Sequence, residues 1–206
     1  SMGKAGIINI ERESAMSGAI HTKGFYILGG LLRHLLRTDH PLNFDASVAF
    51  EQSYGGIDGD SASGAESCCL LSALTDVPLR QDLAMTGAID QMGHVLAIGA
   101  VNEKIEGFYD TCRDIGLTGT QGVIIPKANA GDLMLREDVV DACAAGKFHI
   151  YAVAHIHEAL ALFTGISTGE RDGSGHYPDG TLLALAVRRA REYWQKAGHG
   201  GRAAGT

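Results

Sequence analysis

Apolar residues recur along the chain with two different periods. A period of two over Phe44–Gln52 predicts a half-buried strand, and helical spacing over Ser61–Leu74 predicts a helix. The same criteria predict strands at 6–11, 83–89, 94–98, 122–126 and 149–153, and helices at 24–37, 132–145, 157–163 and 181–196. The strands at 83–89 and 94–98 are expected to form a hairpin-like pair. This alternation of strands and helices predicts an α+β or α/β fold.

A change in composition divides the chain near its C-terminal end. Residues 165–180 are rich in Gly, Ser and Asp, which is typical of a linker or an exposed loop. We therefore expect one domain over residues 3–165. Residues 166–206 are expected to hold the linker, a C-terminal helix and a disordered Gly/Ala tail from Gly198. Ser1 and Met2 resemble a remnant of tag removal and carry no argument.

Charge and cysteine usage exclude several classes of protein. The formal net charge is −7 and the basic residues are scattered, so we expect neither a nucleic-acid partner nor an anionic membrane partner. No apolar run reaches the length that a membrane-spanning helix needs. The four cysteines form no Cys-x-x-Cys pair, so reduced, buried thiols and a cytoplasmic location are expected, with neither disulfide framework nor zinc site.

Ser61 has the most suggestive setting for catalysis among the serines. It follows the Gly-rich turn Gly55–Asp60 and is expected to open a helix, where free backbone N–H groups could stabilise an oxyanion. A serine at a helix start is, however, more often only an N-cap. The α/β-hydrolase motif Gly-x-Ser-x-Gly is absent, and no Gly-Lys-Ser/Thr follows the loop, so the chain carries no phosphate-binding P-loop.

Lys104 is the candidate general base. It follows Asn102, the expected N-cap of a helix with an apolar stripe, and the helix dipole there disfavours its charged form. Burial would favour the neutral amine further, and a neutral amine is what proton abstraction from a serine requires. Taken alone, Lys104 would more often be an ordinary solvated lysine.

Five segments in a fixed order resemble the proteolytic domain of the Lon protease family. Gly59-Asp-Ser-Ala-Ser63 is similar to the B-type branch of that family. Further similarity in Gly6–Glu13, Phe50–Gly59 and Tyr177–Gly180 indicates a bacterial Lon-like subgroup. Ser61 and Lys104 have the separation that the family's dyad requires. The resemblance covers residues 6–165, and its segments are Gly59–Ser63, Val77–Gly87, Gly93–Gly99, Val101–Ile105 and Gly122–Pro126.

This resemblance implies a single Lon-type proteolytic domain with mixed small sheets flanked by helices. It implies a serine endopeptidase with Ser61 as nucleophile, Lys104 as base and Thr86 orienting the lysine amine. Asp60 would contact Lys104 when the site is idle and keep the amine charged. No cofactor or metal is expected in this domain.

The family also implies partners outside this chain. ATP and Mg²⁺ would be bound by a separate AAA+ ATPase module of the full-length chain, which feeds unfolded or damaged proteins into a homo-hexameric chamber. The sequence is therefore expected to be an excised C-terminal part of a longer protein.

A substrate peptide in extended form can bind by pairing with a strand edge. The candidate edge is Phe50, Glu51, Gln52 and Ser53, just before the nucleophile loop, although these residues could instead form a fully paired interior strand.

Other polar residues have two interpretations each. His155 and His157 could bind a metal, but a surface pair is the commoner arrangement. Glu66 could line the site or be solvated, and Asp58 could be only a turn residue.

Three alternatives to a protease stay open. The chain could be a catalytically inactive Lon-like domain acting in assembly or binding, an unrelated α/β enzyme that binds a phosphate ligand, or an interaction module.

Overall fold

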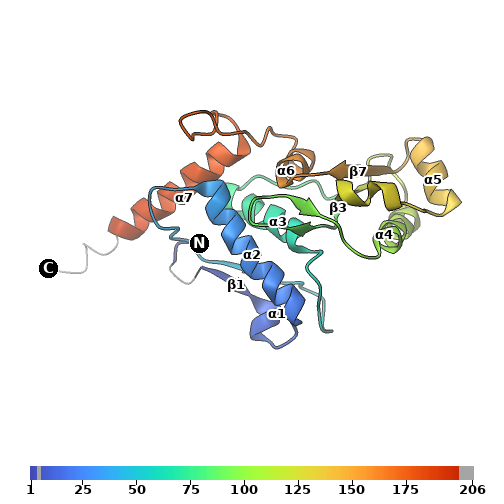
Figure 1. The fold of residues 1–206 in the computed structure, drawn as a ribbon, viewed down its shortest axis with the longest axis horizontal. Coiled ribbons are helices and arrows are strands. Elements are labelled where there is room, and N and C mark those ends of the chain that lie inside the picture. The colour runs from blue at the N-terminus through green and yellow to red at the C-terminus, as the bar shows by residue number, and fades with distance from the viewer. Residues whose placement is uncertain (4–5, 200–206) are drawn as a thin grey trace.

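The computed structural model describes residues 1–3 and 6–199, and Figure 1 shows the arrangement of its elements. The N-terminal part contains β1 (Ile7–Asn9), α1 (Ile10–Glu13), α2 (Ala19–Leu36) and β2 (Ala46–Val48). The central part contains α3 (Ser63–Thr75), β3 (Leu83–Met85), β4 (Ala88–Ile89), β5 (Val95–Leu96) and α4 (Val101–Ile115). The C-terminal part contains β6 (Gly122–Pro126), a 3-10 helix (Lys127–Asp132), α5 (Glu137–Ala144), β7 (His149–Val153), α6 (Ile156–Thr164) and α7 (Leu182–His199).

Three small sheets connect these helices. β3, β6 and β7 form a parallel sheet in that order, with Leu83 opposite Gly122 and Gly122 opposite His149. β1 and β2 pair in parallel, whereas β4 and β5 form an antiparallel hairpin. The predicted α+β architecture, with mixed small sheets flanked by helices, is therefore confirmed.

The central strand β6 separates two hydrophobic cores because its side chains alternate between the two faces of the sheet. Ile124 packs with α2, α3, α6 and α7 in the first core. Val123 and Ile125 point the other way and pack with α4 and α5 in the second core. The first core lies toward α7 and the second toward α5 in Figure 1.

The C-terminal helix is part of the first core rather than an appendage. Leu182, Leu183, Ala186 and Ala190 of α7 are fully or almost fully buried there. The domain boundary expected at residue 165 stays a prediction. In the structure, α7 packs directly against α2 and α3. The predicted disordered tail lies mostly outside the described residues.

Several predicted elements differ in the structure. The predicted strand over 83–89 breaks at Thr86–Gly87, because Gly87 N–H donates to Ser61 O and Gly87 C=O accepts from Gly64 N–H. The predicted helix over 132–145 begins only at Glu137, since the side chains of α4 hold the preceding backbone: Glu106 accepts from Arg136 N–H.

Two further predictions concern membranes and thiols. Within the described part of the chain, no helix combines the length and apolarity needed to cross a bilayer. All four cysteines are free, and Cys68 and Cys112 are buried as expected, but Cys69 is exposed.

Candidate active site

Ser61 lies in a turn between Gly59 and the start of α3. The helix begins at Ser63, two residues later than predicted, with Ala62 as its N-cap. The carbonyl oxygen of Ser61 accepts a hydrogen bond from Gly87 N–H at 2.8 Å. This bond ties the serine to the break between β3 and β4, which the sequence pattern did not predict.

Lys104 reaches Ser61 from the first turn of α4. Its Nζ lies 2.9 Å from Ser61 Oγ and donates a hydrogen bond to it. A second, longer bond of 3.5 Å joins Nζ to Thr86 Oγ1. The three predicted residues Ser61, Lys104 and Thr86 therefore meet, although they lie on three separate segments.

The start of α4 differs from the prediction. Ala100, in the left-handed region at φ 56°, is the N-cap, and Lys104 N–H donates to its carbonyl. Asn102 lies inside the first turn, where its side chain accepts from Met134 N–H. Lys104 is exposed, so this chain alone does not supply the burial that the sequence argument invoked.

A shallow cleft opens at these three side chains. It has a volume of about 250 Å³ and is lined by Ser61, Ala62, Ala84, Met85, Thr86, Lys104, Phe108 and Val123. Most of its remaining wall comes from β3 and from apolar side chains of α4 and β6. A hydroxyl and an amine in hydrogen-bond contact, beside a strand edge, are the parts that acyl transfer to a serine requires.

Asp58 holds the loop before Ser61 against α2. Its Oδ1 accepts hydrogen bonds from the backbone N–H groups of Gly59 at 2.8 Å, and of Ile20 and His21 at 3.1 Å each. These bonds, with that from Gly59 the largest contribution, keep the pKa of the Asp58 carboxyl below its usual value. Asp58 thus caps α2 across the fold. The sequence had suggested only a turn residue.

Asp60 does not contact Lys104 in this structure. Its carbonyl oxygen accepts from the Ser63 backbone and hydroxyl at 3.0 and 2.8 Å. Among the described residues, no ion pair joins the Asp60 carboxylate to a lysine. An idle state in which Asp60 keeps Lys104 charged stays a prediction.

A buried group of titratable residues, which the sequence pattern did not predict, lies behind the loop. Glu11, His21 and Glu66 come from α1, α2 and α3, and each is less than 7% exposed. His21 Nε2 lies 3.8 Å from Glu66 Oε1. Burial raises the pKa of Glu66, His21 opposes this, and Glu11 adds to it. A glutamate in the small, apolar helix after Ser61 was the only signal in the sequence.

Phe50, Glu51, Gln52 and Ser53 do not form the extended edge that was expected. Ser53 N–H bonds back to Phe50 O at 2.9 Å, which makes a turn, and β2 ends at Val48. The cause is the buried cluster: Phe50 N–H donates to Glu11 at 2.8 Å, and the Phe50 ring packs edge-on against His21. The predicted strand is wrong here, and a substrate-binding role stays a prediction.

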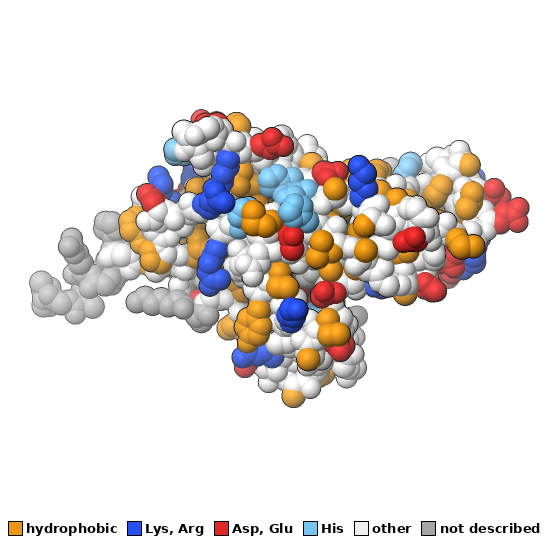
Figure 2. Space-filling model, viewed as in Figure 1, with side chains coloured by type: hydrophobic (Ala, Val, Ile, Leu, Met, Phe, Trp, Pro, Cys, Tyr) orange, Lys and Arg blue, Asp and Glu red, His pale blue; other side chains and the backbone are white. Residues whose placement is uncertain are grey.

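The imidazole rings of His155 and His157 pack edge-on with their centroids 4.5 Å apart, and His94 packs against His155. Figure 2 shows a group of imidazoles on one face of the molecule. His155 caps α6: its Nδ1 accepts a hydrogen bond from His157 N–H at 3.3 Å, and its Nε2 donates one to Met92 O at 3.0 Å. Burial, together with His155, lowers the pKa of His157 to about 4. Over residues 1–3 and 6–199, no three His, Cys, Asp or Glu side chains are grouped so as to hold a metal ion.

Comparison with known proteins agrees with this geometry. Residues 47–164 match the family model described as the Lon protease (S16) C-terminal proteolytic domain. The chain is 43% identical over 197 residues to a putative Lon protease homolog of Escherichia coli K12, covering 96% of this chain and 33% of that protein. It is 49% identical over 163 residues to a putative Lon protease homolog of Haemophilus influenzae, covering 79% of this chain and 27% of that protein.

A more distant relative shares the central part. An archaeal Lon protease of Thermococcus kodakarensis is 40% identical over 119 residues, which is 58% of this chain and 17% of that protein. The chain therefore spans about a third or less of the curated relatives that it matches.

Proposed function

Because this chain belongs to the family of Lon protease C-terminal proteolytic domains, we propose that it is a serine endopeptidase with a Ser61–Lys104 dyad. The observation that carries the proposal is the 2.9 Å contact between Lys104 Nζ and Ser61 Oγ. A hydroxyl becomes a useful nucleophile only when a base within hydrogen-bond reach takes its proton, and this contact provides that reach.

The proposed reaction begins with a neutral Lys104 amine. The amine takes the Ser61 proton while Oγ attacks the peptide carbonyl carbon, and the resulting ammonium then protonates the leaving amine. An acyl-enzyme remains, and water, activated by the same amine, hydrolyses it. Thr86 Oγ1, 3.5 Å from Nζ, holds the amine in line with Ser61.

The oxyanion of the tetrahedral intermediate needs hydrogen-bond donors. The first N–H groups of α3 are already used, because Ser63 N–H bonds to Asp60 O and Gly64 N–H bonds to Gly87 O. In the described part of the chain, the N–H groups of Ser61 and Ala62 have no such partner. We assign the oxyanion site to these two groups, beside the positive end of the α3 dipole.

The substrate would bind along β3 rather than along Phe50–Ser53. β3 is an edge strand, and its residues Ala84 and Met85 line the cleft next to the dyad. In the parallel pairing with β6, Gly122 N–H bonds to Asp82 O and Thr86 N–H bonds to Ile124 O. The peptide groups of Leu83 and Met85 therefore face the free edge. A peptide paired there would cover Lys104, exclude water and favour its neutral form.

The rest of the protease would lie in the longer protein. The Gly-rich loop before Ser61 lacks Gly-Lys-Ser/Thr, so this loop is not a P-loop for a nucleotide phosphate. We propose that ATP and Mg²⁺ are used by an AAA+ module elsewhere in the protein. That module would deliver unfolded proteins to a homo-hexamer of these domains. The match to a third or less of the relatives' length supports this division.

Hydrolysis of a fluorogenic peptide tests the proposal. Ser61→Ala and Lys104→Ala should each reduce kcat by about a thousandfold or more, because the two residues act as a unit. Lys147→Ala is the matched control, since Lys147 is an exposed lysine distant in sequence from the dyad. It should keep full activity.

A serine-directed phosphonate separates the protease from an inactive Lon-like domain. The wild-type chain should be labelled at Ser61, and Lys104→Ala should be labelled far more slowly. Absence of both hydrolysis and labelling, in the presence of the ATPase module, would assign the domain to assembly or binding instead.

A further inference from the structure

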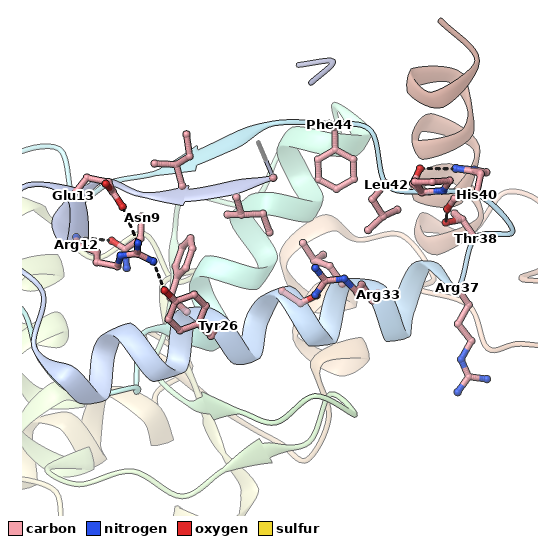
Figure 3. A pocket seen from close by; sticks show the side chains of 17 residues that line it. Asn9, Arg12, Glu13, Tyr26, Arg33, Arg37, Thr38, His40, Leu42 and Phe44 are labelled. Carbon is pink, nitrogen blue, oxygen red and sulfur yellow. Dashed lines mark hydrogen bonds and ion pairs between the residues drawn. The ribbon is translucent and has the colours of Figure 1, made fainter. Parts of the chain in front are cut away.

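A groove runs between β1 and α2 (Figure 3). Its volume is about 970 Å³, at the upper end of the range of about 300–1,000 Å³ typical of ligand sites. One end is formed by Asn9, Arg12 and Tyr26, and the other by His40 and Leu42. None of these residues belongs to the proposed active site.

One wall of the groove is a strand edge with unpaired peptide groups. Within the described residues, β1 pairs only with β2, in a two-stranded sheet. Ala46 N–H donates to Gly6 O, with Ile7 opposite Ala46 in the register. In a parallel pair, successive residues of one strand point their backbone N–H and C=O groups to opposite sides of the strand. The N–H and C=O of Ile8 therefore point toward β2, whereas those of Ile7 point away from it. Such an edge is a template for a further strand.

The floor of the groove is apolar. Phe25, Leu32 and Phe44 are buried beneath it, while Ile8 and Tyr26 remain 41% and 60% exposed. Gly29 of α2 keeps the groove open, because a side chain there would meet only Arg33 Nη1, at 3.7 Å. A bound segment could therefore bury apolar side chains against this floor.

The lining of the groove is positively charged, whereas the chain as a whole is negatively charged. Three arginines and one glutamate line it, in a chain with a formal net charge of −7. Arg12 is paired with Glu13 at 3.3 Å, but Arg33 and Arg37 form no ion pair with any described residue. Arg33 instead lies along its own helix and donates to Gly29 O at 3.2 Å.

Two nearly buried polar side chains in the groove each have one polar atom without a partner among the described residues. Their other polar atoms are bonded, because Asn9 Oδ1 accepts from Arg12 N–H and His40 Nδ1 donates to Pro41 O. Asn9 and His40 are 4% and 7% exposed, and Asn9 Nδ2 and His40 Nε2 have no hydrogen-bond partner. A buried polar atom without a hydrogen-bond partner destabilises the folded state. Carbonyl and N–H groups of a peptide are the kind of partner that these atoms need.

We propose that the groove binds an extended protein segment of alternating apolar and acidic residues, added as a strand to the free edge of β1. The peptide groups of Ile7 would pair with the segment, its apolar side chains would cover Phe25 and Phe44, and its carboxylates would pair with Arg33. An anionic amphiphile would satisfy the floor and the arginines but leaves the strand edge unpaired, so the peptide accounts for more of the groove.

Fluorescence anisotropy with labelled octapeptides tests this proposal. The probes are an alternating Val-Glu octapeptide, an alternating Val-Lys octapeptide and the Val-Glu peptide with N-methylated backbone. All measurements use the Ser61→Ala protein, so the probes are not cleaved and the result does not depend on the proposed peptidase activity. The Val-Glu peptide should bind, and both other probes should bind at least about tenfold more weakly.

Two variants locate the binding. Arg33→Glu should weaken the Val-Glu peptide by about tenfold and strengthen the Val-Lys peptide, whereas Lys147→Glu, with the same change of net charge, should do neither. Gly29→Leu should abolish binding while the melting temperature stays at or above that of the parent, because Leu favours the helix and its Cβ meets only the flexible Arg33 side chain, at 3.7 Å.

Several results would overturn the proposal. They are equal binding of the acidic and basic peptides, indifference to Arg33→Glu, or unchanged binding of Gly29→Leu. Undiminished binding of the N-methylated peptide, displaced by dodecanoate, would assign the groove to an anionic amphiphile and refute strand addition. In each case the hydrolysis assay on the wild-type chain remains a separate test of the dyad.

Discussion

The role of Thr86 can be tested by removing only its hydroxyl. Thr86→Val keeps the shape of a side chain that is 8% exposed, and deletes the acceptor for Lys104 Nζ. The Nζ–Oγ1 distance of 3.5 Å is long for a hydrogen bond, whereas the Nζ–Ser61 Oγ distance is 2.9 Å. Such a long bond is worth about 1 kcal/mol rather than the larger value of a short charge-assisted bond.

This value translates into a small but measurable loss of activity. We expect kcat to fall about fivefold in Thr86→Val, since about 1.4 kcal/mol corresponds to tenfold in rate. In Lys104→Ala, kcat should fall about a hundredfold further than in Thr86→Val. Thr86→Ser retains the hydroxyl and should recover most of the loss, measured as kcat and KM on a fluorogenic peptide.

A second threonine provides the control. Thr111 on α4 donates to Gly107 O at 3.0 Å on the exposed side of the helix, so Thr111→Val should not change kcat. The reasoning fails if Thr86→Val stays within twofold of the parent, or if Thr86→Ser is as slow as Thr86→Val. A loss in Thr86→Val as large as that of Lys104→Ala would mean that Thr86 does more than orient the amine.

Three further predictions concern stability and are measured by urea unfolding. Gly64→Ala would place a Cβ 2.5 Å from the Met85 methyl and should destabilise the fold by about 1–3 kcal/mol. The control, Gly107→Ala, meets open space and should stabilise the fold by about 0.5–1 kcal/mol. Similar effects of the two changes on the free energy of unfolding would contradict this reasoning. Because burial and a nearby imidazole lower the pKa of His157 to about 4 in the folded state, the unfolded chain binds more protons below its ordinary pKa of about 6.5. Stability should therefore fall by about 1–2 kcal/mol between pH 6.5 and 4, and His157→Gln should remove that slope. Burial raises the pKa of Glu66, so its contribution to stability is present below the unfolded pKa of 4.5 and is lost as pH rises through the folded value. Glu66→Gln should flatten this pH dependence and should not lower the free energy of unfolding at pH 8. A clear loss of stability in Glu66→Gln at pH 8 would show that the charged carboxylate is needed.

The pairing of Ser61 with Lys104 was predictable because the motifs around the two residues are local and occur in a diagnostic order. Gly59–Ser63 and Val101–Ile105 carry the pattern without any knowledge of the fold, and periodicity placed Lys104 at a helix start. The contact between the two side chains agrees with that prediction, although it required three segments to meet.

The substrate edge was not predictable in the same way. Alternating apolar residues over 44–52 are compatible with a longer strand, and only the buried Glu11 and His21 show why the chain turns at Phe50. Both residues are distant in sequence, so no window around Phe50 contains the cause. The same holds for the break of the strand over 83–89, which results from hydrogen bonds to Ser61 and Gly64.

The sequence by itself determined the class of fold, the family and the candidate nucleophile and base, because periodicity and short motifs are properties of neighbouring residues. Tertiary structure alone decided which strand edge lies beside Ser61, how Asp58 holds the loop before Ser61, and where β1 leaves an unpaired edge above an apolar floor. These features depend on hydrogen bonds and packing between residues far apart along the chain, and burial of such groups has no signature in the local pattern.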